Sequence, residues 1–160
     1  MMKRLFALLT ALCLLALPAA ALAEAEAGWT RIEFPEGFAL SLPEDWLCYE
    51  VSEADAAAGL AYVFSDAEGA HQLYISRAET GAASLEELAE ALTFDRVTIP
   101  TGNTVYVTYV DGTSFGAAML LDGAAWEFLF TGAEDGDFLS LAGEIMEGYA
   151  ELEPSEEVGA

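Results

Sequence analysis

Apolar residues recur at every second position in several short segments, and this period of two is typical of half-buried β-strands. The alternation is clear in segments 30–34 and 38–42, which flank a tight Pro- and Gly-containing turn at 35–37. It returns in segments 60–64 and 73–75, on either side of an acidic turn. The pattern therefore predicts two antiparallel hairpins in the first half of the chain.

Three apolar runs lie between residues 104 and 131, separated by Asp-Gly pairs at 111–112 and 122–123. Asp-Gly is favoured in two-residue hairpins because both central residues need a positive φ angle. The runs predict a three-stranded antiparallel meander, with three aromatic side chains on one face of its last strand. Several of these strands carry apolar residues on both faces, which predicts a sheet covered on both sides.

Helical periodicity marks the segments between the strands. Ser52 is expected to begin a short helix as its N-cap, and Gly59 to end it. Ser84 and Glu87 have the spacing of a capping box, ahead of an apolar stripe over residues 85–92. Both helices are therefore predicted from their starting residues as well as from their apolar spacing.

A final helix follows a polar loop, with Asp137 as its expected cap and an apolar stripe over residues 138–149. The helices do not follow every strand, which excludes a doubly wound parallel sheet. The predicted fold class is α+β: a single domain in which an antiparallel β-sheet is flanked by helices in an α/β/α sandwich.

The N-terminal segment has the pattern of a secretory signal peptide. Lys3 and Arg4 precede a short apolar run, and small residues at 21 and 23 form a cleavage pattern that predicts a cut after Ala23. We expect the mature protein to be secreted or periplasmic, with no membrane span after cleavage. The expected divisions are a signal peptide over 1–23, a leader over 24–28, the sandwich domain over 29–150 and a disordered acidic tail over 151–160.

The charge of the chain narrows the function classes. It has 5 Lys+Arg against 28 Asp+Glu, a formal charge of −23, and removal of Lys3 and Arg4 with the signal peptide makes the mature chain more negative still. Nucleic-acid binding is excluded because such a chain cannot displace the phosphate counterions. An anionic membrane surface would repel it. Cys48 is the one cysteine after the leader, so no internal disulfide is possible.

One catalytic motif is present. Residues 112–116 match G-x-S-x-G, in which Ser114 would be the nucleophile of a small serine hydrolase. That chemistry needs the serine on a strand-to-helix turn and a histidine later in the chain. Here the glycine belongs to a hairpin, and the sole histidine, His71, comes before the serine. The favoured interpretation of Ser114 is an ordinary strand residue, and the chain is predicted not to be an enzyme.

His71 and Cys48 have structural interpretations. His71 is in phase with the apolar residues that follow it, which favours a half-buried strand position over a metal ligand or an acid/base group. Cys48 lies in an apolar segment without a nearby cation to lower its pKa, which favours a small buried residue over a nucleophile. The three tryptophans are expected in the core or at its rim.

Two acidic turns could bind a divalent cation. The candidate metal ligands are Glu134 and Asp135 in one turn and Asp66 and Glu68 in the other. Neither turn has the ligand spacing of a twelve-residue calcium loop. Acidic turns are most often solvated, so no metal or other cofactor is assigned.

Segment 38–46, an apolar strand followed by Pro, two acidic residues and Trp, resembles the start of PsbP-like domains. The later order is also similar: a hairpin, a capped helix at Ser84, a meander with Asp-Gly turns and a terminal helix. The resemblance covers Trp29 to Glu151. It identifies the chain as similar to the exported bacterial members of the PsbP-like superfamily, whose sandwich fold is shared by photosystem II extrinsic subunits and a Ran-binding nuclear-import factor. The resemblance implies an antiparallel sheet between helices, usually without catalysis, and it carries no functional residues to this chain.

The function predicted from the sequence is an exported, non-catalytic binding or accessory domain. Its partner is a protein or a small molecule, with cationic partners favoured by the charge. Two alternatives stay open: an acidic domain that binds a divalent cation, and a small serine hydrolase that uses Ser114.

Overall fold

The computed structural model describes residues 28–78, 80–92, 97–101, 104–111, 114–132 and 136–152. The expected signal peptide with its cut after Ala23 lies outside the described residues, as does the tail from residue 153 onward. The described helices are α2 (Glu53–Ala57), α3 (Leu85–Leu92) and α4 (Gly136–Glu147). The described strands are β1 (Trp29–Phe34), β2 (Phe38–Pro43), β3 (Leu47–Tyr49), β4 (Leu60–Ser65), β5 (Gln72–Ala78), β6 (Val97–Thr101), β7 (Thr104–Asp111), β8 (Ser114–Leu121), β9 (Ala124–Thr131) and β10 (Ala150–Glu151).

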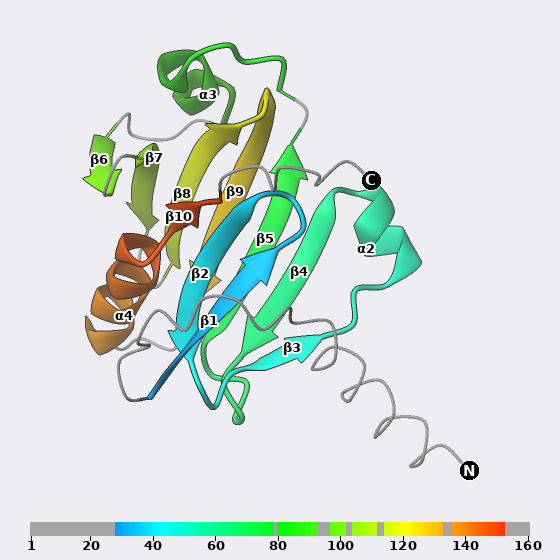
Figure 1. Cartoon of the computed structure of the whole chain (residues 1–160), viewed down its shortest axis with the longest axis vertical. Coiled ribbons are helices and arrows are strands. Elements are labelled where there is room, and N and C mark those ends of the chain that lie inside the picture. The colour runs from blue at the N-terminus through cyan, green and yellow to red at the C-terminus, as the bar shows by residue number, and fades with distance from the viewer. Residues whose placement is uncertain are drawn as a thin grey trace, which may run out of the picture.

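These strands form two antiparallel sheets (Figure 1). The small sheet has the order β1-β2-β10, and the large sheet has the order β3-β4-β5-β9-β8-β7-β6. The two hairpins and the meander that the alternation predicts are confirmed by the β1–β2, β4–β5, β7–β8 and β8–β9 pairs. The return of β9 to the side of β5 joins the hairpin region and the meander into one sheet.

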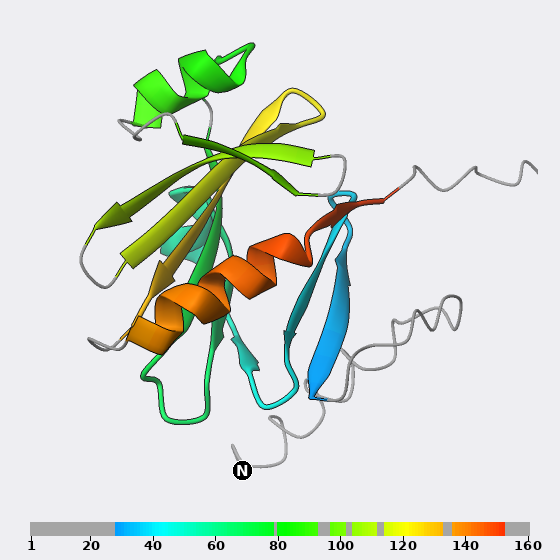
Figure 2. The same cartoon turned by 90° about the vertical axis from the view of Figure 1, so that its left-hand side faces the viewer.

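The large sheet lies between two layers (Figure 2). Helix α3 packs on one face, against β7 and β8, whereas α4 and the small sheet pack on the other, where α4 contacts β2 and β8. The α+β class and the antiparallel sheet flanked by helices are confirmed. The small sheet is a further part of the second layer, which the sequence pattern does not separate from the large one.

The main core fills the space between the two sheets and α4. Phe38 lies at its centre: its ring centroid is 4.5 Å from that of Phe34, 5.4 Å from that of Trp126 and 5.7 Å from that of Phe128. Trp126 is buried, and Trp29 and Trp46 are partly buried against the same cluster, which confirms the core and rim positions expected for them.

Local signals in the sequence are mostly confirmed. Asp122 and Gly123 have φ angles of 50° and 75°, as a two-residue hairpin requires. The Glu87 backbone N–H donates to Ser84 Oγ at 3.2 Å, which confirms Ser84 as a helix cap. The Glu87 carboxylate accepts instead from the N–H of Ala83, at 2.8 Å, one residue earlier than a capping box predicts.

Both ends of α4 differ slightly from the prediction. The helix begins at Gly136, so Asp137 lies in its first turn rather than at the cap, where a carboxylate still favours the positive end of the helix dipole. Beyond the helix, Glu151 of β10 pairs with Phe38 of β2, although the sequence analysis places Glu151 in the disordered tail. The Leu152 N–H also donates to the Gly37 oxygen at 2.8 Å, so backbone pairing continues two residues past the expected boundary at 150.

Candidate functional site

A row of side chains crosses the outer half of the large sheet on the side away from the main core. Tyr49 of β3 pairs with Val63 of β4, Val63 with Tyr74 of β5, and Tyr74 with Leu129 of β9. Residues directly opposite each other in antiparallel strands point to the same face of a sheet. The side chains of Tyr49, Val63, Tyr74 and Leu129 therefore form one apolar row, called here the open-face row.

The open-face row is less buried than the residues that alternate with it. Phe64, Leu73 and Phe128 point to the other side of the same strands and are 3%, 0% and 0% exposed. Val63, Tyr74 and Leu129 are only half-buried, and Tyr49 is 46% exposed. The large sheet is thus sealed on its core side and accessible on the side of the row.

Helix α3 covers only one end of this face. Its buried residues Leu88 and Ala89 pack on Ala118 of β8 and Ala125 of β9. Among the described residues, the cluster under α3 does not include Tyr74 or any other member of the open-face row. The expectation of a sheet covered on both sides is therefore met at the α3 end, whereas no described helix covers the β3 end.

The outer edge of this face is formed by β3, whose three residues are all exposed. Leu47 is 51% exposed and extends the apolar surface beyond Tyr49. Cys48, between them, is also exposed, so the prediction that it is a small buried residue is wrong. An apolar segment is buried only when something packs on it, and among the described strands β3 pairs with β4 alone.

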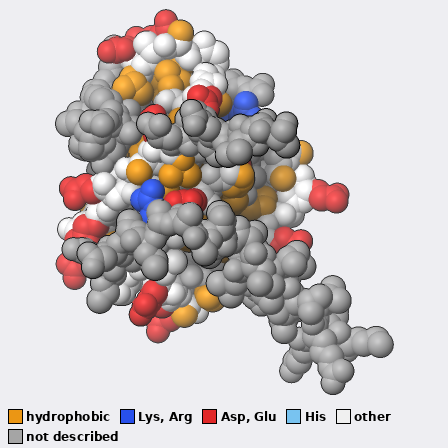
Figure 3. All heavy atoms as spheres, in the orientation of Figure 1, with side chains coloured by type: hydrophobic (Ala, Val, Ile, Leu, Met, Phe, Trp, Pro, Cys, Tyr) orange, Lys and Arg blue, Asp and Glu red, His pale blue; other side chains and the backbone are white. Residues whose placement is uncertain are grey.

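Carboxylates lie near both ends of the open-face row, beside β3 and on β9. Glu44, Asp45 and Glu50 are exposed beside β3. Glu127 of β9 lies on the same face as Leu129, two residues away, and burial raises the pKa of its carboxyl. Figure 3, in the orientation of Figure 1, shows the opposite face, with the small sheet and α4 toward the viewer; acidic side chains are spread over its described surface and basic ones are sparse. The charge of the chain is therefore present around the apolar surface as well as elsewhere.

The structure separates the two residues of the hydrolase hypothesis. Ser114 starts β8 and pairs with Thr131 of β9, on the side of the open-face row. The His71 ring stacks on Phe138 of α4, with centroids 4.7 Å apart, and so lies on the core side. A serine and an imidazole on opposite faces of a sheet cannot exchange a proton directly.

His71 is half-buried, as predicted, although it lies just before β5 rather than within it. Its Nδ1 is 2.8 Å from an oxygen of Asp66. The other Asp66 oxygen accepts from the backbone N–H of Ala70 at 2.8 Å. Burial opposes ionisation of Asp66, but the hydrogen bonds from Ala70 and His71 outweigh it and lower the pKa of the carboxyl.

The positions of the candidate metal ligands do not form a cation site among the described residues. Both oxygens of Asp66 are engaged within its own turn, and Glu68 is exposed. Glu134 and Asp135 lie outside the described residues. The part of the chain that the structure describes contains no group of three or more His, Cys, Asp or Glu side chains that could hold a metal ion.

The alternation of apolar residues does not by itself predict the open-face row. Its signal was the apolar residues that interrupt strict alternation, such as Tyr74 between Leu73 and Ile75, and Leu129 between Phe128 and Phe130. Such residues indicate a second apolar face, but the sequence does not state whether a helix covers it.

Comparisons with known proteins bear on the fold. No family model and no curated protein sequence matches the chain. The fold is similar to that of cyanobacterial PsbP (CyanoP) from Synechocystis sp. PCC 6803, with a TM-score of 0.58 and 16% sequence identity over 82% of this chain and 97% of that one. Of the described helices, none is both long and apolar enough to cross a membrane. The architecture and this similarity together show that the chain has a PsbP-like fold.

Proposed function

We propose that the chain is an exported, non-catalytic accessory domain that binds a basic protein partner on the open face of its large sheet. The observation that carries this proposal is the open-face row, which ends in the exposed side chains of Tyr49 and Leu47 at the edge of the sheet. Contiguous exposed apolar surface with a polar surround is typical of interaction sites. Export is supported by the signal-peptide pattern of residues 1–23.

The charges around the row favour a partner of opposite sign. Glu44, Asp45 and Glu50 surround β3, and Glu127 lies within the face itself. Lys or Arg side chains of a partner would be attracted to this surface and would compensate the half-buried Glu127. The partner that fits is a segment with apolar residues on one side and basic residues on the other.

The edge of β3 adds backbone groups to this surface. Among the described strands β3 pairs with β4 alone, so β3 is an edge strand of the large sheet. An extended partner segment can pair with such an edge while its side chains contact the neighbouring face. This would place the partner's apolar residues beside Leu47 and Tyr49.

The serine-hydrolase alternative gains no support from the positions of the described residues. Ser114 and His71 lie on opposite faces of the large sheet, and His71 is engaged with Asp66. The similarity to cyanobacterial PsbP concerns the fold, and the accessory role is proposed from the surface of this chain.

The test is affinity capture from the native cell envelope and culture medium with three forms of the protein. The wild type should retain a basic protein that dissociates as salt is raised from about 0.15 M to about 1 M. Over this range the Debye length, which is the distance over which charges interact, falls from about 8 Å to about 3 Å. The double variant Leu47→Ser/Tyr49→Ser should lose the basic protein. Thr30→Ala, an exposed change on the edge strand of the small sheet, is the matched control and should keep it.

Capture of the same proteins by all three forms would contradict the proposal, because retention would then depend on charge and not on the open face. Far-ultraviolet circular dichroism and thermal unfolding of each variant establish that it is folded. Both substituted residues are exposed, so the fold is expected to survive.

A further inference from the structure

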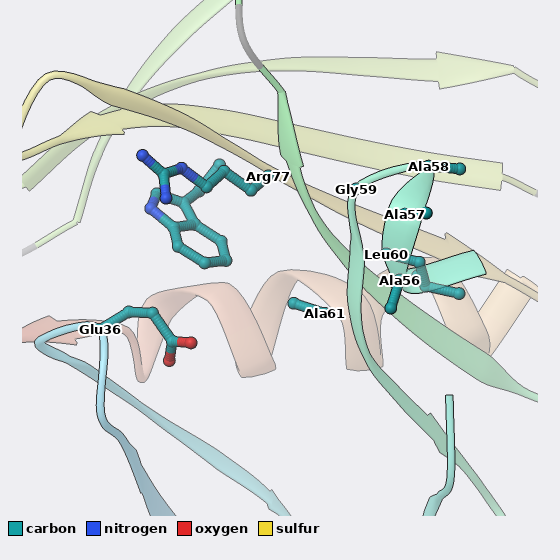
Figure 4. Close-up of a pocket in the computed structure, with 9 residues that line it drawn as sticks. Glu36, Ala56, Ala57, Ala58, Gly59, Leu60, Ala61 and Arg77 are labelled. Carbon is teal, nitrogen blue, oxygen red and sulfur yellow. The ribbon is translucent and has the colours of Figure 1, made fainter. Parts of the chain in front are cut away.

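A groove of about 640 Å³ lies on the other side of the large sheet, at the corner formed by α2, the start of β4 and the turn between β1 and β2. It is lined by Glu36, Arg77, Trp126 and the small-residue segment 56–61. Its volume is within the range of small-molecule sites, which is about 300–1,000 Å³. Figure 4 shows Glu36 and Arg77 reaching into this region from different elements.

The local sequence builds one wall of this groove. Gly59 has a φ of +100°, and a Cβ there would lie 2.6 Å from the backbone oxygen of Arg77. This close approach lets the Arg77 N–H donate to the Gly59 oxygen at 2.8 Å. The β4–β5 register then shifts between Leu60 and Tyr62. A bulge of this kind redirects the strand, and the alanines on either side of Gly59 leave room beside it.

Two opposite charges are presented in the groove. Within the residues that the structure describes, Arg77 forms no ion pair, whereas the Nε of Arg31 lies 3.6 Å from Glu33. In a chain with 28 acidic residues, an exposed arginine without such a pair is available to an external carboxylate. Its guanidinium can bind a carboxylate through two parallel hydrogen bonds.

Glu36 supplies the opposite charge and is held in position. The Tyr62 hydroxyl lies 3.0 and 2.9 Å from its two carboxylate oxygens. Burial, together with the charge and hydrogen bond of Glu36, raises the pKa of Tyr62 well above its usual range, so the hydroxyl stays a donor. The carboxylate is thus oriented at the groove without a described cation to neutralise it.

The lining of the groove also includes an aromatic ring. Trp126 pairs directly with Arg77 across β9 and β5, so both side chains are on the same face of the large sheet. The Trp126 side chain is fixed by the main core and is 5% exposed. It gives the groove a rigid apolar surface for the body of a ligand.

We propose that this groove binds a small zwitterion, a free amino acid or a short unblocked peptide, whose carboxylate is bound by Arg77 and whose ammonium group is bound by Glu36. A simple anion would meet the Glu36 carboxylate, and a simple cation would meet the Arg77 guanidinium. A ligand with both charges satisfies both side chains while its carbon skeleton contacts Trp126 and the alanines. The site is on the opposite face from the open-face row and does not depend on the proposed function.

The test uses the common amino acids and a set of unblocked dipeptides, screened by thermal shift and then titrated by calorimetry. The best probe is compared with its N-acetyl and C-terminal amide forms. Each blocked form should bind at least about tenfold more weakly, because each loses a charge-assisted hydrogen bond. Arg77→Gln and Glu36→Gln should each weaken the free probe by a similar factor.

The matched controls are Arg31→Gln and Glu33→Gln, which remove one charge of each sign on β1 and should leave binding unchanged. Absence of binding by every unblocked probe up to about 10 mM would overturn the proposal. Equal binding of the blocked and free forms would also overturn it, since recognition would then not involve the charges. Circular dichroism of the two groove variants establishes that they are folded.

Discussion

The imidazole of His71 lies with its Nδ1 2.8 Å from a carboxylate oxygen of Asp66, and this contact closes the turn between β4 and β5. The backbone N–H groups of Ala70 and His71 donate to the same carboxylate. The His71 ring also stacks on Phe138, which connects the turn to α4. Asp66 therefore stabilises the folded state most when it is ionised.

The stability of the protein should depend on pH through Asp66. The pKa of Asp66 in the folded protein lies below its ordinary value of 3.8, so its contribution is present above that pH and is lost as the pH falls through the folded-state pKa. The difference in unfolding free energy between the wild type and Asp66→Asn should therefore shrink as the pH is lowered below about 4.

Urea unfolding at a series of pH values measures this difference. Glu68→Gln is the control for the loss of one negative charge in the same turn. A difference between the wild type and Asp66→Asn that stays constant down to the lowest pH would show that the carboxylate is not held in its ionised form.

Removal of two tyrosine hydroxyls should change the free energy of unfolding in opposite directions. The hydroxyl of Tyr149 is buried and has no hydrogen-bond partner among the described residues, and burial raises its pKa. Tyr149→Phe should raise the free energy of unfolding by about 1 kcal/mol, because it removes an unsatisfied polar group. Tyr62→Phe should lower it by about 1 kcal/mol, because the bond to Glu36 is lost. Equilibrium denaturation of both variants is the measurement, and destabilisation by Tyr149→Phe would indicate a partner for its hydroxyl.

Gly59 should be more sensitive to substitution by alanine than Gly37. Gly59→Ala places a Cβ 2.6 Å from the Arg77 backbone oxygen in a left-handed conformation, and should lower the unfolding free energy by more than about 2 kcal/mol. Gly37 has a similar φ of +94° but open space around it, so Gly37→Ala should cost only about 1 kcal/mol. Equal losses in chemical denaturation would mean that conformational strain, and not the contact with β5, decides the effect.

Aromatic residues in the core and on the open face should differ sharply in their effect on stability. Phe38 is fully buried among Phe34, Trp126 and Phe128, so Phe38→Ala should cost about 4 kcal/mol. Tyr49→Ala, at an exposed position, should change stability by less than about 0.5 kcal/mol. Thermal and chemical unfolding distinguish them, and a large loss for Tyr49→Ala would mean that its side chain supports the fold.

Much of the fold follows from local patterns. The alternation of segments 30–34 and 38–42 predicts β1 and β2, and the Asp-Gly pair at 122–123 predicts the β8–β9 turn. These signals depend on residues a few positions apart. The exposure of Cys48 could not be predicted in the same way, because burial of β3 depends on what lies at the edge of the sheet.

The two candidate sites depend on longer-range geometry. The open-face row exists because β9 returns to the side of β5, which brings Leu129 opposite Tyr74. The groove exists because a bulge near Ala61 and the turn at Glu36 meet at one corner of the fold. Neither strand order nor the position of a bulge is encoded in a single segment, so only the structure reveals these arrangements.

The pairing of β10 with β2 has a consequence for the order in which the chain can assemble. Among the described strands, β1 and β2 come first in the sequence, yet the third strand of their sheet is formed by Ala150 and Glu151. The Leu152 N–H also donates to the Gly37 oxygen at 2.8 Å. Contacts this distant in sequence form late, after the intervening chain has been placed. The β1–β2 hairpin therefore gains the third strand of its sheet only after residues 150–152 have been synthesised.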